Sequence, residues 1–387
     1  MPFYYKLGEL PPRRHITFYK PDGKSLYREE LFSTRGFSGV YSNKYHFHIP
    51  PQVKEITEIK PFSVKDWDDA PIQYYHFVTG RKVTPGNILT ARQSFMRNSG
   101  CNISTAHITE EADFFYKNSQ MSELIFIHHG SGKMYSEYGV IPFSEWDYLI
   151  IPKGTVYQLK FDSFENVKLL IIESPTPFEI PRHFRNEYGQ LNEDAPYYER
   201  DFRPPSHLEP HFEEGDFKMI VNLNGRHFEY AVPHHPFDVV GWDGFLYPYA
   251  FNIKDYAPKV GRLHLPPPVH LLFWTQNFVV CNFCPRLFDF DPQAIPAPYF
   301  HTNIDSDEVI YYVDGDFMSR KAISEGSVTL HPMGIPHGPQ PGKTEASIGA
   351  KETFEYAIMV DTYAPLKLTE NVKETLIEGY ENSWLEV

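Results

Sequence analysis

Hydrophobic residues recur along the chain in short runs that are rich in β-branched and aromatic side chains. Clear examples are residues 124–127, 148–151, 167–172, 278–283 and 355–361. Runs of this kind, separated by Gly, Pro, Asn, Asp or Ser, are typical of β-strands, whereas long windows with helical periodicity are scarce. The pattern therefore predicts an all-β protein built from sandwiches or barrels.

Three residues of the segment 298–341 can hold one metal ion: His301, Glu308 and His337. Two neutral imidazoles and one carboxylate on one face of an ion leave the opposite coordination positions open. This arrangement is the facial triad of non-haem Fe(II) oxygenases, in which substrate and O2 occupy the open positions. The segment is therefore the strongest candidate for a metal centre.

The local sequence predicts how these residues come together. Residues 309–313 are β-branched and aromatic, so they predict a strand that begins at Glu308, and residues 314–315 (Asp-Gly) predict a tight turn after it. Residues 327–330 predict a second strand, which is followed by a proline-rich bend just before His337. A small antiparallel barrel can hold a metal ion in its mouth in this way.

The same pattern occurs earlier in the chain with different residues at two of the three positions. The segment FFYKNSQMSELIFIHHGSG, which begins at Phe114, matches YFHTNIDSDEVIYYVDGDF, which begins at Tyr299. The glutamate is retained as Glu123, whereas Tyr116 and Tyr157 occupy the two histidine positions. The chain therefore contains one supersecondary unit twice. Because a glutamate between two neutral phenols is a poor site for a divalent cation, we predict a metal centre in the second copy alone.

Two further carboxylates flank the predicted site. Asp305 and Asp307 are alternatives to Glu308 as the acidic ligand. The match between the two copies pairs Glu308 with the glutamate of the first copy, which favours Glu308. An EF-hand is not predicted from this acidic run, because the required glycine and ligand spacing are absent.

Polar residues around the metal segment are candidates for handling a substrate. His264 and His270 lie upstream, and either can serve as an acid–base group. Arg286 and Arg320 are candidates for binding a carboxylate with two hydrogen bonds. For each residue the alternative is an ordinary salt bridge or a hydrogen-bonded loop histidine.

Length and charge bound the class of protein. A chain of 387 residues can bury a large core in two domains, which we place at residues 1–250 and 251–387, with the first copy at about residues 101–175. The net charge of −14 and the lack of a long basic run argue against nucleic acid and anionic membranes as partners. The sequence shows no long apolar span and no secretory signal, and three cysteines do not form a disulfide framework. We therefore expect a cytoplasmic location.

The segments outside the two copies carry less information. Residues 1–50 are rich in Tyr, Phe, Pro and Gly, and predict extended arms that make oligomer contacts. Residues 173–250 are rich in proline and predict irregular structure, except for a short strand within residues 237–244. Residues 366–387 are acidic and predict a short helix, to which we assign no chemistry.

These residues resemble the homogentisate 1,2-dioxygenases, which are two-cupin Fe(II) enzymes. The resemblance covers nearly the whole chain and includes KLGELPPRRH near the start, HHPFDVVGWDG in the middle and PYFHTN…E…PHGP in the metal segment. By position, the iron ligands of the family correspond to His301, Glu308 and His337. The family histidine that acts on the substrate hydroxyl corresponds best to His264, with His270 as the rival.

The resemblance implies a duplicated double-stranded β-helix (cupin) fold, in which the N-terminal copy is degenerate and the C-terminal copy binds Fe(II). It implies that O2 and homogentisate, a small aromatic acid, give maleylacetoacetate in phenylalanine and tyrosine catabolism. It also implies a homo-oligomer, either a trimer or a hexamer. The substrate-binding residues that it implies are Arg286, Phe317, His331 and Gln340. Phe317 and Gln340 stand where well-known family members carry Tyr and Asp.

Two other functions agree with the same residues. The first is a related cupin dioxygenase that acts on gentisate or another dihydroxy aromatic acid. The second, from a different class, is a non-catalytic bicupin that binds a ligand or a metal ion. One intact set of metal ligands argues against the non-catalytic protein, which two degenerate copies would favour.

Overall fold

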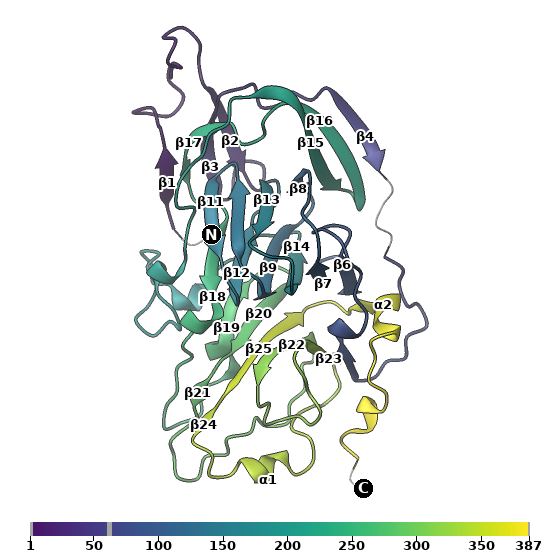
Figure 1. Ribbon diagram of the computed structural model, residues 1–387. Coiled ribbons are helices and arrows are strands. Elements are labelled where there is room, and N and C mark those ends of the chain that lie inside the picture. Colours follow the sequence, from purple (N-terminus) through teal and green to yellow (C-terminus); the bar gives the residue numbers. More distant parts are fainter. Residues whose placement is uncertain (1–2, 60–63, 386–387) are drawn as a thin grey trace.

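Two seven-stranded sheets form most of the first half of the chain (Figure 1). A computed structural model describes residues 3–59 and 64–385 of the whole chain. The first sheet consists, in spatial order, of β18 (Tyr249–Asn252), β12 (Asp147–Ile151), β9 (Ser122–His129), β14 (Val167–Ser174), β7 (Asn102–Ile108), β6 (Arg92–Arg97) and β26 (Lys367–Leu368). The second consists of β11 (Gly139–Phe143), β10 (Gly132–Ser136), β13 (Val156–Phe161), β8 (Phe115–Asn118), β15 (Glu214–Leu223), β16 (Arg226–His234) and β4 (Glu55–Ile59).

The chain from β7 to β14 passes back and forth between these two sheets. Strands β7, β9, β12 and β14 lie in the first sheet, and β8, β10, β11 and β13 lie in the second. Such alternation between two sheets produces the double-stranded jelly roll that defines cupins. The all-β cupin fold expected from the sequence is therefore confirmed.

A six-stranded sheet forms the centre of the second copy. It consists, in spatial order, of β19 (Leu271–Trp274), β20 (Phe278–Phe283), β25 (Glu355–Thr362), β22 (Asp307–Gly315), β23 (Ser327–His331) and β5 (Tyr75–Val78). This order repeats the order β6-β7-β14-β9-β12-β18 of the first sheet. The duplication predicted from the sequence is thus present in the strand topology.

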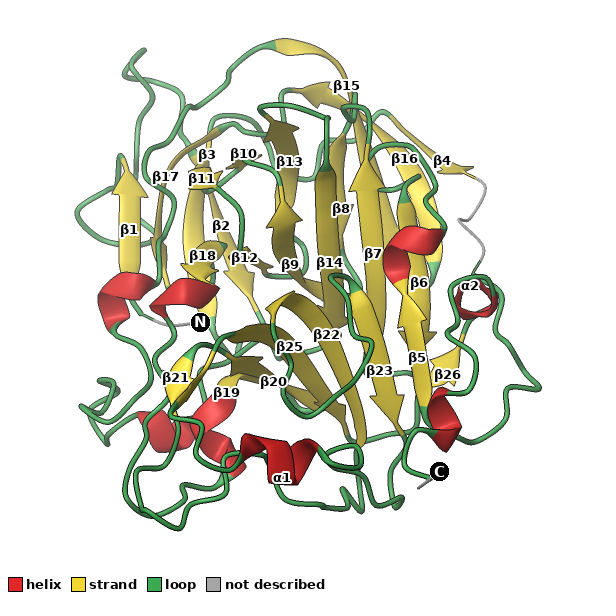
Figure 2. Cartoon of the chain, turned by 60° about the horizontal axis from the view of Figure 1, so that its bottom comes forward, coloured by secondary structure: helices red, strands yellow, loops and turns green. Residues whose placement is uncertain are grey.

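Less regular structure lies opposite this six-stranded sheet. Strands β21 (Arg286–Leu287) and β24 (Glu352–Thr353) form a two-stranded sheet, and a single bridge joins His301 to His337. The short helix α1 (Lys343–Ser347) lies at the same end of the molecule (Figure 2). The second copy therefore combines one regular sheet with loops that leave room for a site.

The two copies pack through alternate residues of their strands. Phe126 and Leu170 of the first copy share a core with Val309 and Tyr311 of the second. The intervening residues, such as Ile125, line the interior of the first barrel instead. Because successive side chains of a strand point to opposite faces, both faces of β9 and β14 are buried. This explains why these strands are continuous apolar runs in the sequence.

A histidine also connects the two copies. Nδ1 of His128, in β9, lies 2.5 Å from the hydroxyl of Tyr311, and its Nε2 lies 3.2 Å from the carbonyl oxygen of Val313. Burial lowers the pKa of His128 to about 3, so the ring is neutral. A neutral imidazole that donates from Nε2 accepts at Nδ1, so the Tyr311 hydroxyl donates to His128.

The N-terminal residues form a smaller sheet within the chain. Its strands, in spatial order, are β1 (Tyr5–Gly8), β17 (Val239–Gly244), β3 (Tyr41–His46) and β2 (Arg28–Ser33). The predicted arm of residues 1–50 thus pairs with the middle of its own chain. Its role in oligomer contacts stays a prediction.

The expectation of irregular structure is wrong at residues 214–234, where β15 and β16 lie, whereas β17 agrees with the short strand expected after residue 236. Strand β15 places Phe217, Met219 and Val221 at alternate positions and Lys218 and Asn222 between them, although the intervening Ile220 is also buried. That alternation predicts a strand with one covered face, but the neighbouring prolines hid it.

The tight turn predicted at residues 314–315 is also wrong. Strand β22 continues through Gly315, and residues 316–326 connect it to β23. Gly315 has a φ of 117° and pairs with Glu355, and an added Cβ would lie 2.3 Å from the carbonyl oxygen of Phe354. The glycine is therefore required by close strand contact rather than by a turn.

The two halves on either side of the predicted domain boundary contribute strands to each other's sheets. The boundary at residue 250 falls inside β18, which pairs with β12. Strand β5 of the first half completes the sheet of the second copy, and β26 of the second half extends the first sheet. The division at residue 250 stays a prediction.

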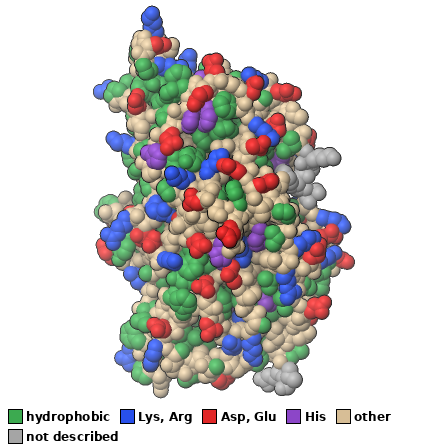
Figure 3. All heavy atoms as spheres, in the orientation of Figure 1, with side chains coloured by type: hydrophobic (Ala, Val, Ile, Leu, Met, Phe, Trp, Pro, Cys, Tyr) green, Lys and Arg blue, Asp and Glu red, His purple; other side chains and the backbone are tan. Residues whose placement is uncertain are grey.

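The helices are short. Besides α1 they are α2 (Glu370–Lys373), in the predicted C-terminal helical region, and the 3-10 turns η1 (Thr79–Arg81), η2 (Arg182–Phe184), η3 (Glu199–Asp201), η4 (Ile253–Asp255), η5 (Pro267–His270) and η6 (Tyr380–Asn382). Within the described residues, none of the helices has the length and apolar character of a membrane span. Acidic and basic side chains are interspersed on the face shown in Figure 3.

The contact between the two copies can be tested by removing one hydroxyl. Tyr311→Phe leaves Nδ1 of His128 buried without a donor, so we expect the free energy of unfolding to fall by about 1–3 kcal/mol. Urea denaturation measures this change. Tyr363→Phe, at a side chain that is 45% exposed, should change stability by less than about 0.5 kcal/mol. Equal stability of the two variants would contradict the role of the hydrogen bond.

Candidate metal centre

The three predicted ligands lie together in the second copy. The ligand atoms of His301, Glu308 and His337 are all within 4.8 Å of one another. Oε2 of Glu308 is 3.5 Å from Nε2 of His301 and 3.4 Å from Nε2 of His337. Metal–nitrogen and metal–oxygen bonds are about 2.0–2.2 Å long, so one ion can contact all three atoms. The His301 side chain is 35% exposed, so the cluster is open on that side.

Backbone carbonyls orient both histidines. Nδ1 of His301 donates to the carbonyl oxygen of Tyr299 (3.2 Å), and Nδ1 of His337 donates to that of Ile335 (3.1 Å). With Nδ1 protonated, each Nε2 presents a lone pair toward Glu308, which is the orientation that metal-binding histidines adopt. Nε2 of His337 is buried and has no hydrogen-bond partner. A bound cation would satisfy these facing acceptors.

Strand pairing sets this geometry. Glu308, in β22, pairs with His331 at the end of β23. The backbone groups of His301 and His337 exchange two hydrogen bonds of 2.9 Å. In the first copy, Tyr116 pairs with Tyr157 in the same way as His301 pairs with His337 in the second. The two members of each pair are far apart in the sequence. The correspondence predicted between the two copies therefore holds at the level of residue pairs.

His331 holds the carboxylate from behind. Its Nδ1 lies 2.7 Å from Oε1 of Glu308, and its Nε2 lies 3.2 Å from the hydroxyl of Tyr380. Burial lowers the pKa of His331 to about 4, so the ring is neutral and donates to Oε1. This leaves Oε2 to face the two other histidines. His331, which the sequence suggests as a substrate-binding residue, thus occupies a supporting position.

The corresponding site of the first copy contains an internal cation. Nη2 of Arg92 lies 2.9 Å from Oε1 of Glu123, and Nη1 lies 3.2 Å from Oε1 of Glu173. The hydroxyl of Tyr157 donates to the other oxygen of Glu123 (2.8 Å). The guanidinium group therefore neutralises two buried carboxylates at this site.

The second copy has the two carboxylates, but among the described residues neither forms an ion pair with Lys or Arg, and the buried Arg320 acts on Glu308 only at longer range. Asp361 corresponds to Glu173, because it pairs with Glu308 as Glu173 pairs with Glu123. Burial and the neighbouring Glu308 raise the pKa of Asp361 to about 8, and its Oδ1 has no hydrogen-bond partner. Across residues 3–59 and 64–385, Glu308 forms salt bridges with histidines alone. Glu308 is thus a buried negative charge without a Lys or Arg ion pair among the described residues, and Asp361 is a second carboxyl group beside it that an ion could help to ionise, which fits a bound divalent cation.

Asp361 was missed by the sequence analysis, although a signal was present. The segment 171–177 (IIESPTP) matches the segment 359–365 (MVDTYAP) when Glu173 is aligned with Asp361. The shared Pro and the acidic residue four positions before it continue the repeat. Extending the comparison to the last strand of each copy would have found this residue.

The two alternative carboxylates lie differently. Oδ1 of Asp307 accepts from the backbone N–H of Met333 (2.8 Å), and Oδ2 accepts from that of Leu366 (2.7 Å). Asp305 is exposed. Because adjacent residues of a strand point to opposite faces, Asp307 faces away from the position that Glu308 occupies.

Phe317 and Gln340 support the loop of residues 316–326. The ring of Phe317 packs edge-on against Tyr312, with ring centroids 4.6 Å apart. Oε1 of Gln340 accepts from the backbone N–H of Lys321 (2.5 Å). Both side chains are buried, so this geometry gives them a packing role beside the centre.

The two arginines are engaged with acceptors of their own chain. Nη1 of Arg286 lies 3.4 Å from Oε1 of Glu355 and 3.2 Å from the carbonyl oxygen of Cys284. Arg320 is buried, and its Nη1 donates to the carbonyl oxygen of Gly338 (2.6 Å). The structure thus brings Arg320 to the residue that follows His337, whereas Arg286 lies against β25.

The two upstream histidines have contrasting environments. The side chain of His264 is 59% exposed, and its Nδ1 donates to Oδ2 of Asp289 (2.8 Å). The ring of Tyr299 lies between His264 and His301, with centroid distances of 5.5 and 6.2 Å. His270 packs against an aromatic ring, and burial lowers its pKa to about 3.

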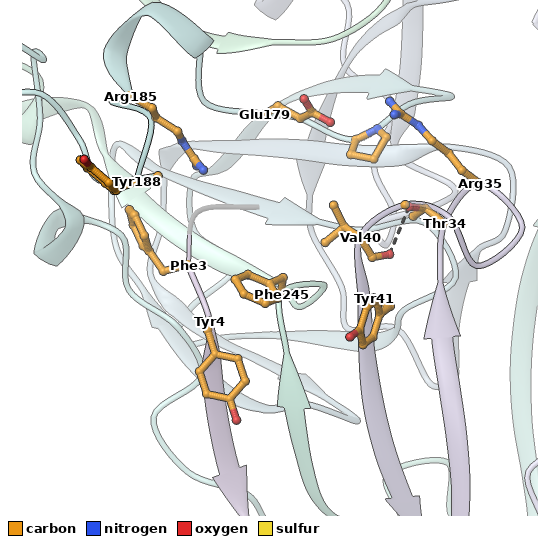
Figure 4. A pocket seen from close by; sticks show the side chains of 13 residues that line it. Phe3, Tyr4, Thr34, Arg35, Val40, Tyr41, Glu179, Arg185, Tyr188 and Phe245 are labelled. Carbon is orange, nitrogen blue, oxygen red and sulfur yellow. Dashed lines mark hydrogen bonds between the residues drawn. The ribbon is translucent and has the colours of Figure 1, made fainter. Parts of the chain in front are cut away.

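A separate cavity of about 480 Å³ lies near the N-terminus (Figure 4). Its lining residues are Phe3, Tyr4, Thr34, Arg35, Gly39, Val40, Tyr41, Pro177, Glu179, Arg185, Tyr188, Gly189 and Phe245. None of the site residues predicted from the sequence is among them. The predicted chemistry is therefore located in the second copy and not in this cavity.

The fold and the cluster together define a cupin with a candidate two-histidine, one-carboxylate metal centre. The model of the family "Homogentisate 1,2-dioxygenase N-terminal" matches residues 56–253. A protein of Saccharolobus solfataricus named "Putative dioxygenase" is 41% identical over an alignment of 387 positions that covers 99% of each chain. The chain belongs to the homogentisate 1,2-dioxygenase family and is a cupin dioxygenase.

Relatives that are named for their substrate are more distant. The homogentisate 1,2-dioxygenase of Bradyrhizobium diazoefficiens is 24% identical over 93% of this chain and 86% of its own. Among solved structures, a cupin 2 conserved barrel domain protein from Leptotrichia buccalis covers 80% of this chain and 99% of its own, at 10% identity and a TM-score of 0.37. The architecture described above therefore rests on the strand pairing of this chain.

The metal centre can be tested with matched glutamate variants. We expect Glu308→Gln to lose bound divalent metal after anaerobic reconstitution, because the amide removes the negative charge that faces the two histidines. Glu123→Gln changes the corresponding residue of the first copy and should retain the metal. Elemental analysis measures metal per chain. Equal metal content in the two variants would place the ion elsewhere.

The internal cation of the first copy gives a second prediction. Arg92→Leu leaves two carboxylates buried without a counter-charge, which should cost about 3–5 kcal/mol of unfolding free energy in urea. Arg97→Leu, on the same strand and 39% exposed in its pair with Asp66, should cost less than about 1 kcal/mol. A small effect of Arg92→Leu would show that the charge balance is met in another way.

Proposed function

We propose that the chain is an Fe(II)-dependent dioxygenase that converts homogentisate and O2 to maleylacetoacetate. One observation carries the proposal: Oε2 of Glu308 faces the Nε2 atoms of His301 and His337, and in the described part of the chain no Lys or Arg forms an ion pair with it. Membership of a dioxygenase family supports the reaction class. The identity of 24% to a homogentisate enzyme leaves the particular aromatic acid as the finer part of the proposal.

We assign Fe(II) to the ligands His301, Glu308 and His337. Two imidazoles and one carboxylate with open positions are the donor set of non-haem Fe(II) oxygenases. When bound, Fe(II) supplies adjacent open positions at which a ring hydroxyl and O2 can meet. The carbonyls behind the two histidines, and His331 behind Glu308, keep the donor atoms aimed at one point.

The environments of the two upstream histidines favour His264 as the acid–base group. Asp289 accepts from its Nδ1 and thereby orients the ring, in the manner of other carboxylate–histidine pairs. Tyr299 connects it to the ligand His301 by ring contacts on both sides. Burial lowers the pKa of His270 to about 3, so its ring is a weak base for the proton of a substrate hydroxyl.

Exposed apolar side chains lie beside the open ligand. Tyr299, Phe300 and Ile304 flank His301 in the sequence and are 52%, 64% and 80% exposed. Large apolar side chains on a surface favour contact with a ligand or another protein. Next to a metal centre they suit the ring of an aromatic acid, and we propose that they cover the bound substrate.

We also propose that the protein is a homo-oligomer, a trimer or a hexamer. The N-terminal arm exposes Tyr4, Tyr19 and Phe37, and the last of these is 72% exposed. Such residues fit the oligomer contacts predicted for this arm.

Oxygen consumption tests the function directly. After anaerobic reconstitution with Fe(II), we expect rapid O2 uptake with homogentisate and slower uptake with gentisate and other dihydroxy aromatic acids. His264→Gln should lower kcat by about 10²–10⁴-fold while retaining iron, because it removes an acid–base group. His207→Gln is the matched control: that side chain is 53% exposed and also pairs with a carboxylate, Glu209, at 2.8 Å.

Each outcome separates the alternatives. Faster uptake with gentisate than with homogentisate would assign the related dioxygenase activity instead. Bound iron without O2 uptake on any acid of the panel would favour a non-catalytic bicupin. Full activity of His264→Gln would contradict its assignment as the acid–base group.

A further inference from the structure

We propose that Tyr380 and Trp384 position the metal ligands, so that the C-terminal end of the chain is a working part of the metal centre. This inference rests on the proposed function and extends it to a segment to which the sequence assigned no chemistry. Backbone pairing holds the segment in place, because the N–H of Ile377 donates to the carbonyl oxygen of His76 in β5 (2.8 Å). Figure 2 shows the end of the described chain beside the sheet that contains β5 and β23.

The first contact runs from Tyr380 to the carboxylate ligand. The hydroxyl of Tyr380 lies 3.2 Å from Nε2 of His331, and Nδ1 of His331 lies 2.7 Å from Oε1 of Glu308. Because Nδ1 donates to the carboxylate, Nε2 carries no proton and accepts from the phenol. Tyr380 therefore fixes the tautomer and the plane of His331. All three side chains are buried, so water does not compete for these hydrogen bonds.

The second contact runs from Trp384 to the backbone beside a ligand. Nε1 of Trp384 donates to the carbonyl oxygen of Gly338 (3.0 Å), which also accepts from Nη1 of Arg320 (2.6 Å). The guanidinium group of Arg320 lies over the ring of Trp384, 5.5 Å from its centroid. Gly338 directly follows His337, so this carbonyl fixes the path of the backbone at the ligand.

Tyr74 completes the support on the other side of His337. Its hydroxyl donates to the carbonyl oxygen of Pro336 (2.6 Å), and its ring packs against Trp384 with centroids 4.7 Å apart. The Tyr74 hydroxyl and the Trp384 indole thus hold the carbonyls of the residues on either side of His337, which are Pro336 and Gly338. Partners that orient ligands from outside the metal sphere usually affect metal affinity strongly, which is the role we assign to the C-terminal segment.

Two conservative variants test the proposal. Tyr380→Phe and Trp384→Phe keep an aromatic ring and remove one donor each. With Co(II) as the probe in an anaerobic chelator competition, we expect each variant to bind about 10–100-fold more weakly than the wild type. We also expect the visible absorption bands of bound Co(II) to shift, because they report ligand geometry. A purely structural role would lower thermal stability and leave these bands unchanged.

Tyr197→Phe is the matched control. It removes another buried hydroxyl, which donates to the carbonyl oxygen of Leu272 (3.3 Å), and it should leave the Co(II) affinity and spectrum unchanged. Wild-type affinity and spectrum in Tyr380→Phe or Trp384→Phe would overturn the role assigned to that residue. Equal weakening by Tyr197→Phe would overturn the proposal as a whole, because general destabilisation would then explain the effect.

The same experiment separates this proposal from the proposed function. If the wild type binds Co(II) but its Fe(II) form consumes no O2, the catalytic function fails, and the variant comparison still decides the role of Tyr380 and Trp384. If the wild type binds no Co(II), the metal centre and this inference are both overturned.

Discussion

Buried negative charge that requires a cation is the constraint on which the centre of each copy depends. A carboxylate in a protein interior is costly unless a positive charge lies beside it. In the first copy the guanidinium group of Arg92 contacts Glu123 and Glu173. In the second copy, Glu308 forms no ion pair with Lys or Arg among the described residues, the pKa of the neighbouring Asp361 is raised to about 8, and imidazole nitrogens face the site instead. One fold thus meets the same requirement with a side chain in one copy and, on our proposal, with a metal ion in the other.

The remaining structure keeps this difference in place. The equivalent strand order of the two copies presents a glutamate at the same interior position in both barrels. The first barrel closes over a largely apolar interior that contains the Arg92–Glu123–Glu173 group, whereas His301 of the second copy is partly exposed. The apolar contact between the two sheets, together with the exchanged edge strands β5 and β26, holds both barrels in one body. The first copy therefore shares both a core and edge strands with the copy that contains the candidate metal centre.

Much of this could be predicted from residues that recur. The strands at 124–127, 148–151 and 167–172 were predicted because both of their faces are buried, which gives continuous apolar runs. The cluster of His301, Glu308 and His337 was predicted because the repeat marks equivalent positions, and the structure brings the three side chains together. The assignment of these residues as metal ligands stays a prediction.

Other features depend on contacts that one sequence does not display. Gly315 follows an aspartate, as turn glycines often do. Its lack of a side chain instead lets β22 approach the backbone of Phe354 and Glu355 closely. Strand β15 contains several polar residues and therefore lacks a continuous apolar run. The prolines near it then suggested a loop. The support of the centre by Tyr380 joins residues 49 positions apart in the chain, and only the folded structure brings the phenol to His331.

Anomalous X-ray scattering at the iron edge, from crystals reconstituted with Fe(II) without O2, tests the central claim most directly. The account predicts a single strong peak in each chain, bonded to Nε2 of His301, Nε2 of His337 and Oε2 of Glu308, and no peak beside Glu123, where Arg92 takes the place of an ion. The absence of a peak among those three atoms, or a peak at another place in the chain, would contradict it.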